Sequence, residues 1–274
     1  MFSQVFSAIW VLGLIGIVSS VVLVIAAKFM SVHEDERITL LTDLLPGANC
    51  GACGYAGCAG YAEAIAAEEV SIGLCIPGGD STSIAIAEIM DTEAVNIEEM
   101  IAVVRCRGSH SFTDKKFDYT GVESCSAAAM LYKGNGKCAY GCLGFGDCVE
   151  VCKFDAITVL DGVAYIDDNA CTGCGACAPA CPKGVIEVVS DGKKAIITCI
   201  STEKGADTRR ACTAGCMGCT LCKKECPENA IEIKNNLAVV DFEKCSGCEK
   251  CVSVCPTSAI RMLLFKQKPL QINA

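Results

Sequence analysis

The first thirty residues differ from the rest of the chain in their pattern of apolar and charged positions. Residues 4 to 27 form a mostly apolar run of 24 positions without a charged side chain, and Lys28 ends it. As a helix, this run would be roughly 36 Å long at about 1.5 Å per residue, enough to cross a hydrocarbon core of about 30 Å. A signal peptide would have a basic start and a shorter apolar core. The pattern therefore predicts an uncleaved transmembrane anchor over residues 1–30.

The basic residues near this run predict its orientation. Lys28 and Arg37 follow the run and nothing basic precedes it, so the positive-inside tendency places the body of the protein on the cytoplasmic side. A reducing cytoplasm also agrees with unpaired thiols. We therefore expect a single-pass protein of the cell membrane with its body in the cytoplasm.

Beyond the anchor, the apolar positions predict one helix and two β-hairpins. In residues 61–70, Ala62, Ile65, Ala66 and Val70 lie near one face of an amphipathic helix. Farther along, "AITV" and "VAYID" flank a turn with glycine, and "AIEI" and "LAVVDF" flank a turn with two asparagines. Short apolar runs on either side of such turn residues are typical of β-hairpins.

Cysteine content indicates bound metal. The chain has 24 cysteines among 274 residues, many of them separated by two residues. Close neighbours of this kind do not readily pair in unstrained disulfides, but together they can bind one inorganic group. All 24 are candidate metal ligands.

A repeat of 74 residues organises most of these cysteines. A shift of 74 positions without a gap superimposes nine pairs, which indicates a duplicated structural unit. The pairs are Cys125 and Cys199, Cys138 and Cys212, Cys142 and Cys216, Cys148 and Cys222, Cys152 and Cys226, Cys171 and Cys245, Cys174 and Cys248, Cys177 and Cys251, and Cys181 and Cys255.

The second copy has the spacing of a bacterial two-cluster ferredoxin. Each of its two runs reads C-x2-C-x2-C-x3-C-P, and in such runs the fourth cysteine binds the cluster of the other run. The spacing therefore predicts one [4Fe-4S] cluster on Cys216, Cys219, Cys222 and Cys255, and another on Cys245, Cys248, Cys251 and Cys226.

The first copy departs from this spacing at one ligand. One cluster is expected on Cys171, Cys174, Cys177 and Cys152, whereas the other has only Cys142, Cys148 and Cys181, because Phe145 stands where the second copy has Cys219. Its fourth ligand is either Cys138 or Cys106. With Cys106 in that role, the unassigned cysteines are Cys125, Cys138, Cys199 and Cys212, and a sixth cluster between the copies could use them.

A further cysteine group precedes the repeat. Cys50, Cys53, Cys58 and Cys75 surround the predicted helix, with several glycines between the first three. Four thiolates also suit zinc, but zinc sites often use two C-x2-C pairs and only one is present here. We therefore expect an iron–sulfur cluster, which brings the expected number of [4Fe-4S] clusters to five, with a sixth as an alternative.

Charge separates the chain into two parts. Residues 31–99 carry thirteen acidic residues and one arginine, whereas the remainder after residue 99 is nearly balanced. No basic stripe with interleaved aromatic residues is present, which argues against nucleic-acid binding. Lys193, Lys194, Lys204, Arg209 and Arg210 gather near the second copy and could steer an acidic protein partner.

The order of these motifs resembles the B subunit of the Rnf complexes, over nearly the whole chain. The resemblance is carried by the anchor, by "CGACGYAGCAGYAEAI" with "CIPGG", and by the run from "ESCSAAAM" to "GDCVEVC". It implies a membrane complex that moves electrons between ferredoxin and NAD and couples this to Na⁺ or H⁺ transport. It also implies other membrane and flavin-carrying subunits as partners, with no bond chemistry in this chain alone.

Together these features predict an α+β protein with five parts. They are a transmembrane anchor (1–30), a small helical 4Fe-4S domain (31–99), a first ferredoxin-like unit (100–190), a second ferredoxin-like unit (191–264) and a tail (265–274). The expected function is electron transfer from ferredoxin through a chain of clusters toward the membrane. The alternatives are an iron–sulfur redox sensor or carrier outside a respiratory complex, and a zinc-rich structural module.

Overall fold

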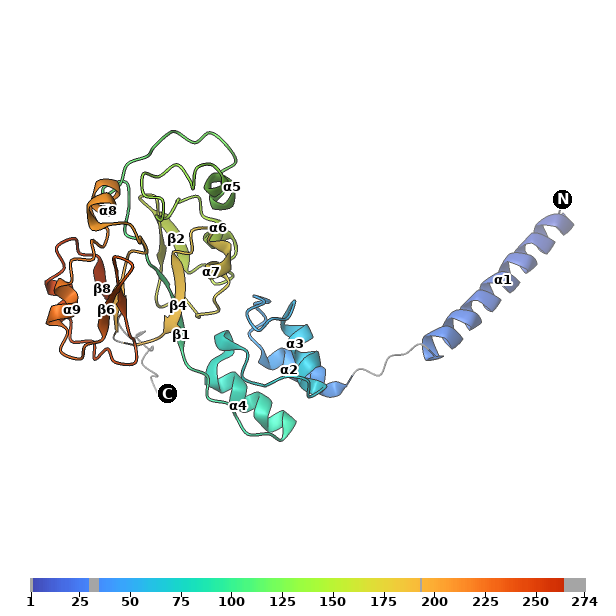
Figure 1. Cartoon of the computed structure of the whole chain (residues 1–274). Coiled ribbons are helices and arrows are strands. Elements are labelled where there is room, and N and C mark those ends of the chain that lie inside the picture. The colour runs from blue at the N-terminus through green and yellow to red at the C-terminus, as the bar shows by residue number, and fades with distance from the viewer. Residues whose placement is uncertain (1, 30–34, 193, 264–274) are drawn as a thin grey trace, which may run out of the picture.

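The computed structural model describes residues 2–29, 35–192 and 194–263 (Figure 1). Its first element is helix α1, Phe2–Phe29. Over the described residues, no helix combines the length and the apolar character needed to cross a membrane, so the membrane anchor stays a prediction. The predicted tail, residues 265–274, lies outside the described residues.

A small helical domain follows. It contains α2 (Glu36–Leu44), α3 (Cys58–Ala66), a 3-10 turn at Ile76–Gly78 and α4 (Gly79–Met90). Its core is made of Leu41, Tyr61, Ile65 and Ile86, which are almost fully buried. The predicted helix is confirmed as α3, but it begins at Cys58 and ends at Ala66, because Glu68 adopts a positive φ of 57°.

The rest of the chain forms two units of the same design, each with two small antiparallel sheets (Figure 1). The strands of the first unit are β1 (Met100–Val104), β2 (Ile157–Leu160), β3 (Val163–Ile166) and β4 (Ile186–Ser190). Its helices are α5 (Cys125–Met130), α6 (Asp147–Glu150) and α7 (Cys177–Ala180).

The second unit repeats this arrangement. Its strands are β5 (Lys194–Ile197), β6 (Ile231–Lys234), β7 (Leu237–Val240) and β8 (Ile260–Leu263). Its helices are α8 (Gly205–Ala211), α9 (Leu221–Glu225) and α10 (Lys250–Ser253).

Both predicted hairpins are confirmed, as β2–β3 and β6–β7. Asn235 and Asn236 take the positive φ values that the second turn requires, 49° and 63°. The second sheet of each unit, β1–β4 in the first and β5–β8 in the second, was not predicted, because its strands are 82 and 63 residues apart between paired ends such as Val104–Ile186 and Ile197–Ile260.

Strand register aligns the two units differently from the gapless repeat. Val104 pairs with Ile186, and Ile197 pairs with Ile260, and residues 186 and 260 are equivalent after the shift of 74. The next residues agree, since Arg105 N donates to Val185 O at 2.6 Å and Thr198 N donates to Ala259 O at 2.7 Å. Cys106, two residues after β1, is therefore the structural equivalent of Cys199, two residues after β5.

This alignment shows an insertion in the first unit. Cys106 and Cys138 are 32 positions apart, whereas Cys199 and Cys212 are 13 apart, so the first unit carries 19 additional residues here. The longer stretch contains α5 and Cys125. The match of Cys125 with Cys199 by a shift of 74 was therefore a coincidence of numbering.

The two units share a hydrophobic core. Ile101 and Val103 of β1 belong to the same buried cluster as Ile196 of β5 and Leu263 of β8. These side chains are at most 2% exposed, so the sheets β1–β4 and β5–β8 form the contact between the units. This contact fixes the positions of the cysteine loops that emerge from both sheets.

Candidate iron–sulfur centres

All 24 cysteines are free thiols, and twenty of them form five groups of four. The groups are Cys50, Cys53, Cys58 and Cys75; Cys125, Cys142, Cys148 and Cys181; Cys152, Cys171, Cys174 and Cys177; Cys216, Cys219, Cys222 and Cys255; and Cys226, Cys245, Cys248 and Cys251.

The pKa values of the buried thiols report this grouping. Burial is the main cause that raises the pKa of Cys177, Cys222 and Cys251 to about 11, and in each case the other three sulfurs of the group raise it further. Such thiols stay protonated at neutral pH unless a cation binds them, and binding of iron would release their protons.

In the second unit, two cavities contain the crossed cysteine sets that the spacing predicts. The first cavity is lined by Cys216, Cys219 and Cys222 from one run and by Cys255 from the other. The second is lined by Cys245, Cys248 and Cys251 together with Cys226. The thiols of each set surround a space wider than a single ion: among the described residues, no three His, Cys, Asp or Glu side chains are arranged to hold one metal ion.

The first unit completes its irregular set with Cys125. Burial and the neighbouring sulfurs of Cys142, Cys125 and Cys181 raise the pKa of Cys148 to about 12. Neither of the two expected candidates, Cys138 and Cys106, occupies this place. The inserted stretch brings Cys125 to the cluster loop, where the backbone amides of Phe145 and Gly146 face its sulfur. Sequence reasoning missed this residue because nothing in its own spacing relates it to Cys142 and Cys148.

Asp147 holds Cys125 in this position. Its carboxylate accepts hydrogen bonds from Cys125 N at 2.6 Å and Ser126 N at 2.9 Å, and from the hydroxyls of Ser124 and Ser126 at 3.0 and 2.8 Å. Burial alone would raise the pKa of Asp147, but these donors outweigh it and lower the pKa to about 2. The carboxylate therefore fixes the start of α5 against the loop that contains Cys148.

We expect Asp147→Asn to weaken this cluster selectively. An amide loses the negative charge and one acceptor oxygen, so the four charge-assisted hydrogen bonds are reduced at a cost of about 2–4 kcal/mol in the stability of this region. The measurement is the rate of iron release to a chelator under anaerobic conditions. One cluster should be lost faster than in the natural protein, and Asp161→Asn, at an exposed turn, serves as the matched control.

Backbone amides also point at cluster sulfurs in both units. Ala230 N donates to Cys226 Sγ at 3.3 Å, and Ala259 N donates to Cys255 Sγ at 3.2 Å. In the first unit, Ala102 N lies 3.5 Å from Cys171 Sγ. Hydrogen bonds to sulfur favour the more negative, reduced state of a cluster and raise its reduction potential.

The small domain positions its four cysteines through Tyr61 and Asn49. The Tyr61 hydroxyl donates to Ser71 O at 2.8 Å and accepts from Leu74 N at 3.1 Å, which ties the returning chain next to Cys75. Asn49 Oδ1 accepts from Cys58 N at 2.8 Å at the start of α3. Burial, followed by the sulfurs of Cys58, Cys50 and Cys53, raises the pKa of Cys75.

Protein-family models match four segments of the chain. Their descriptions are "Putative Fe-S cluster" over residues 45–77, "4Fe-4S binding domain" over residues 142–156 and again over 164–187, and "4Fe-4S dicluster domain" over residues 210–262. These segments contain the runs described above. Cys106, Cys125, Cys138 and Cys199 lie outside all four.

Curated relatives cover most of the chain. The B subunit of the Na⁺-translocating ferredoxin:NAD⁺ oxidoreductase complex of Acetobacterium woodii is 40% identical over 89% of this chain and 74% of its own length. The B subunit of the ion-translocating oxidoreductase complex of Methanosarcina acetivorans is 40% identical over 89% of this chain and 93% of its own length.

A third relative has a similar name with a different ion. The B subunit of the proton-translocating ferredoxin:NAD⁺ oxidoreductase complex of Clostridium ljungdahlii is 41% identical over 84% of this chain and 82% of its own length. Identity at this level over this share of the chain, together with the 4Fe-4S domains, settles the family. The chain belongs to the family of B subunits of the Rnf, or ion-translocating ferredoxin:NAD⁺ oxidoreductase, complexes.

Proposed function

We propose that this chain accepts electrons from ferredoxin and relays them through [4Fe-4S] clusters to the membrane subunits of an ion-translocating ferredoxin:NAD⁺ oxidoreductase. The observation that carries the proposal is the pair of cavities lined by crossed sets of four cysteines in the second unit. Crossed ligands hold two clusters close together, as electron transfer between them requires. The clusters supply the redox chemistry, and the chain supplies position, burial and hydrogen bonds.

The cysteine groups of the first unit and of the small domain lie next to each other. Burial is the main cause that raises the pKa of Cys174, and the sulfur of Cys50 in the small domain raises it further. A cluster on Cys50, Cys53, Cys58 and Cys75 would therefore be the neighbour of the cluster that Cys174 binds. Because residues 1–30 precede this domain, we place the membrane exit of electrons here, with α1 as the anchor and the body on the cytoplasmic side.

The second unit is suited to receive electrons. Cys219 and Cys248, one from each of its two cysteine groups, are the exposed cysteines of the chain, so these clusters would lie nearest the surface. Of the basic residues singled out in the sequence, Lys204, Arg209 and Arg210 are exposed at α8. Lys194 lies over the Phe242 ring and donates to Ser190 Oγ, and Lys193 lies outside the described residues.

Reduction by ferredoxin tests the proposal directly. When the anaerobically purified complex is mixed with reduced ferredoxin, the visible absorbance of the clusters should bleach rapidly. Bleaching by dithionite without bleaching by ferredoxin would contradict the proposed role while leaving the clusters in place.

We expect the triple variant Lys204→Glu/Arg209→Glu/Arg210→Glu to slow this reaction about tenfold at low salt, with little effect at high salt, because charge steers association. The matched control is Lys133→Glu/Lys137→Glu/Lys153→Glu, which makes the same change in net charge at exposed positions of the first unit. The measurement is the association rate in stopped-flow mixing. Equal slowing by both variants would show a general charge effect and no docking at α8.

A further inference from the structure

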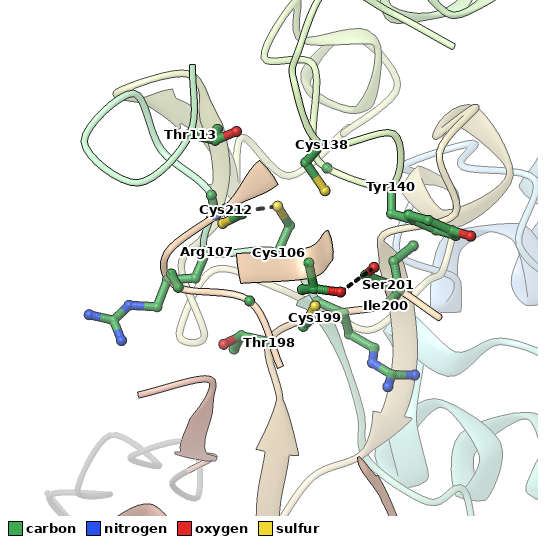
Figure 2. A pocket seen from close by; sticks show the side chains of 16 residues that line it. Cys106, Arg107, Thr113, Cys138, Tyr140, Thr198, Cys199, Ile200, Ser201 and Cys212 are labelled. Atoms are coloured by element: carbon green, nitrogen blue, oxygen red, sulfur yellow. Dashed lines mark hydrogen bonds between the residues drawn. The ribbon is translucent and has the colours of Figure 1, made fainter. Parts of the chain in front are cut away.

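The four remaining cysteines lie together between the two units. Cys106 follows β1, Cys138 lies in the loop before α6, Cys199 follows β5, and Cys212 follows α8. All four line one cavity, and Figure 2 shows their side chains converging on it from four separate segments. None of the five cysteine groups described above uses them.

The four cysteines are two equivalent pairs. Strand register makes Cys106 the counterpart of Cys199, and the repeat of 74 residues makes Cys138 the counterpart of Cys212. Each unit therefore contributes the same two positions to the cavity. A site built in this way from both copies of a duplicated unit is unlike a chance collection of buried thiols.

Cys138 is close to each of the other three. Burial raises the pKa of Cys106 to about 12 and also raises the pKa of Cys199 and Cys212, and the Cys138 sulfur adds to the effect in every case. Backbone amides also face the sulfurs: Gly108 N lies 3.4 Å and Cys142 N lies 3.3 Å from Cys106 Sγ.

Glycines leave space around these sulfurs. A Cβ atom added to Gly108 would lie 3.3 Å from Cys212 Sγ and 3.7 Å from Cys106 Sγ, between the two ligands. One added to Gly141 would lie 3.7 Å from Cys138 Sγ, and one added to Gly215 would lie 3.9 Å from Cys199 Sγ. Any side chain at these positions would extend toward the space that the four thiols enclose.

The wall of the cavity is positively charged and firmly held. Arg105 pairs with Glu187 at 2.8 Å and also donates to Ile197 O of the second unit. Arg107 donates to Ser258 O at 2.7 Å. A four-iron cluster with four thiolate ligands carries net negative charge, so these two guanidinium groups would offset part of its charge.

We propose that Cys106, Cys138, Cys199 and Cys212 bind a sixth [4Fe-4S] cluster that bridges the two units. The inference rests on the proposed electron-relay function and extends it. Cys106 accepts a hydrogen bond from the backbone of Cys142, a ligand of the first unit, and the Cys199 sulfur faces the backbone amide of Cys216, a ligand of the second. The sixth cluster is therefore the step that connects the two pairs of clusters in one path.

The experiment compares the natural full-length protein with Cys199→Ala/Cys212→Ala, with Tyr140→Phe as the control. Tyr140 lines the same cavity and bonds to Thr202 across the units at 3.0 Å, so its loss perturbs the contact without removing a ligand. The readouts are iron, acid-labile sulfide and zinc per chain, and mass-spectrometric mapping of cysteine alkylation in the native protein.

We expect about 24 iron atoms in the natural protein and in Tyr140→Phe, and about 20 in the double variant, with Cys106 and Cys138 newly alkylated. An unchanged iron content in the double variant would overturn the proposal, and so would loss of one zinc ion instead of four irons. If the double variant does not accumulate, the natural protein decides: about 24 irons support a sixth cluster and about 20 refute it. Five intact clusters without the sixth would leave the proposed function standing.

Discussion

Replacing Cys125 by alanine will remove one four-iron cluster, and adding Phe145→Cys to this variant will restore it. The second unit has Cys219 at the position of Phe145, and there the cysteine lies within the regular run. In the first unit that ligand is replaced by Cys125 from the inserted stretch, which reaches the same group of sulfurs. The double variant returns the first unit to the ligand arrangement of the second.

Iron content and alkylation mapping measure this exchange. Cys125→Ala should lose about four irons per chain and expose Cys142, Cys148 and Cys181 to alkylation, and Cys125→Ala/Phe145→Cys should recover both. Phe145→Cys alone is the control: it gives up an edge-to-face contact with Tyr119, whose ring lies 5.4 Å away, at a cost of about 0.5–1.5 kcal/mol, but it keeps every ligand. Full iron content in Cys125→Ala would show that Cys125 is not the fourth ligand.

Replacing Cys255 by alanine will release the cluster of the preceding run and leave its own run protected. Cys255 shares a cavity with Cys216, Cys219 and Cys222, although its nearest cysteine in sequence is Cys251. A four-iron cluster that loses one of four thiolates and gains no substitute is strongly destabilised. About four irons should be lost, and the thiols that become reactive should be those 33 to 39 residues upstream, as the numbering of Cys216, Cys222 and Cys255 gives.

The mirrored variant provides the control for this crossing. Cys226→Ala removes the ligand that shares a cavity with Cys245, Cys248 and Cys251, so it should lose the same amount of iron and expose the opposite set. Uncrossed ligation predicts the reverse assignment of alkylated cysteines in the two variants. That outcome would refute the crossed sets on which the compact pair of clusters depends.

The sequence alone was enough for the features that depend on local spacing. The runs with two residues between cysteines predicted the crossed sets, and the Asn235–Asn236 turn predicted the second hairpin, because in both cases neighbouring residues decide the geometry. Helix α3 was predicted from its apolar face, although its end moved because Glu68 leaves the helical conformation.

Features that depend on distant pairing could not be predicted in this way. The pairing of β1 with β4 joins residues more than 80 positions apart, and without it Cys106 has no visible counterpart in the repeat. A gapless shift also hid the insertion, so Cys125 was matched with Cys199, and the insertion's role in supplying a ligand was invisible. The charge of Asp147 gave no sign that it fixes Cys125, since its hydrogen bonds cross 21 and 22 residues.

The central claim is that the thiols of this chain hold a continuous series of iron–sulfur clusters. The most direct measurement is the amount of iron and acid-labile sulfide per chain in protein isolated without oxygen. The account predicts a brown protein with about 24 of each. A colourless protein that contains neither iron nor labile sulfide would contradict it.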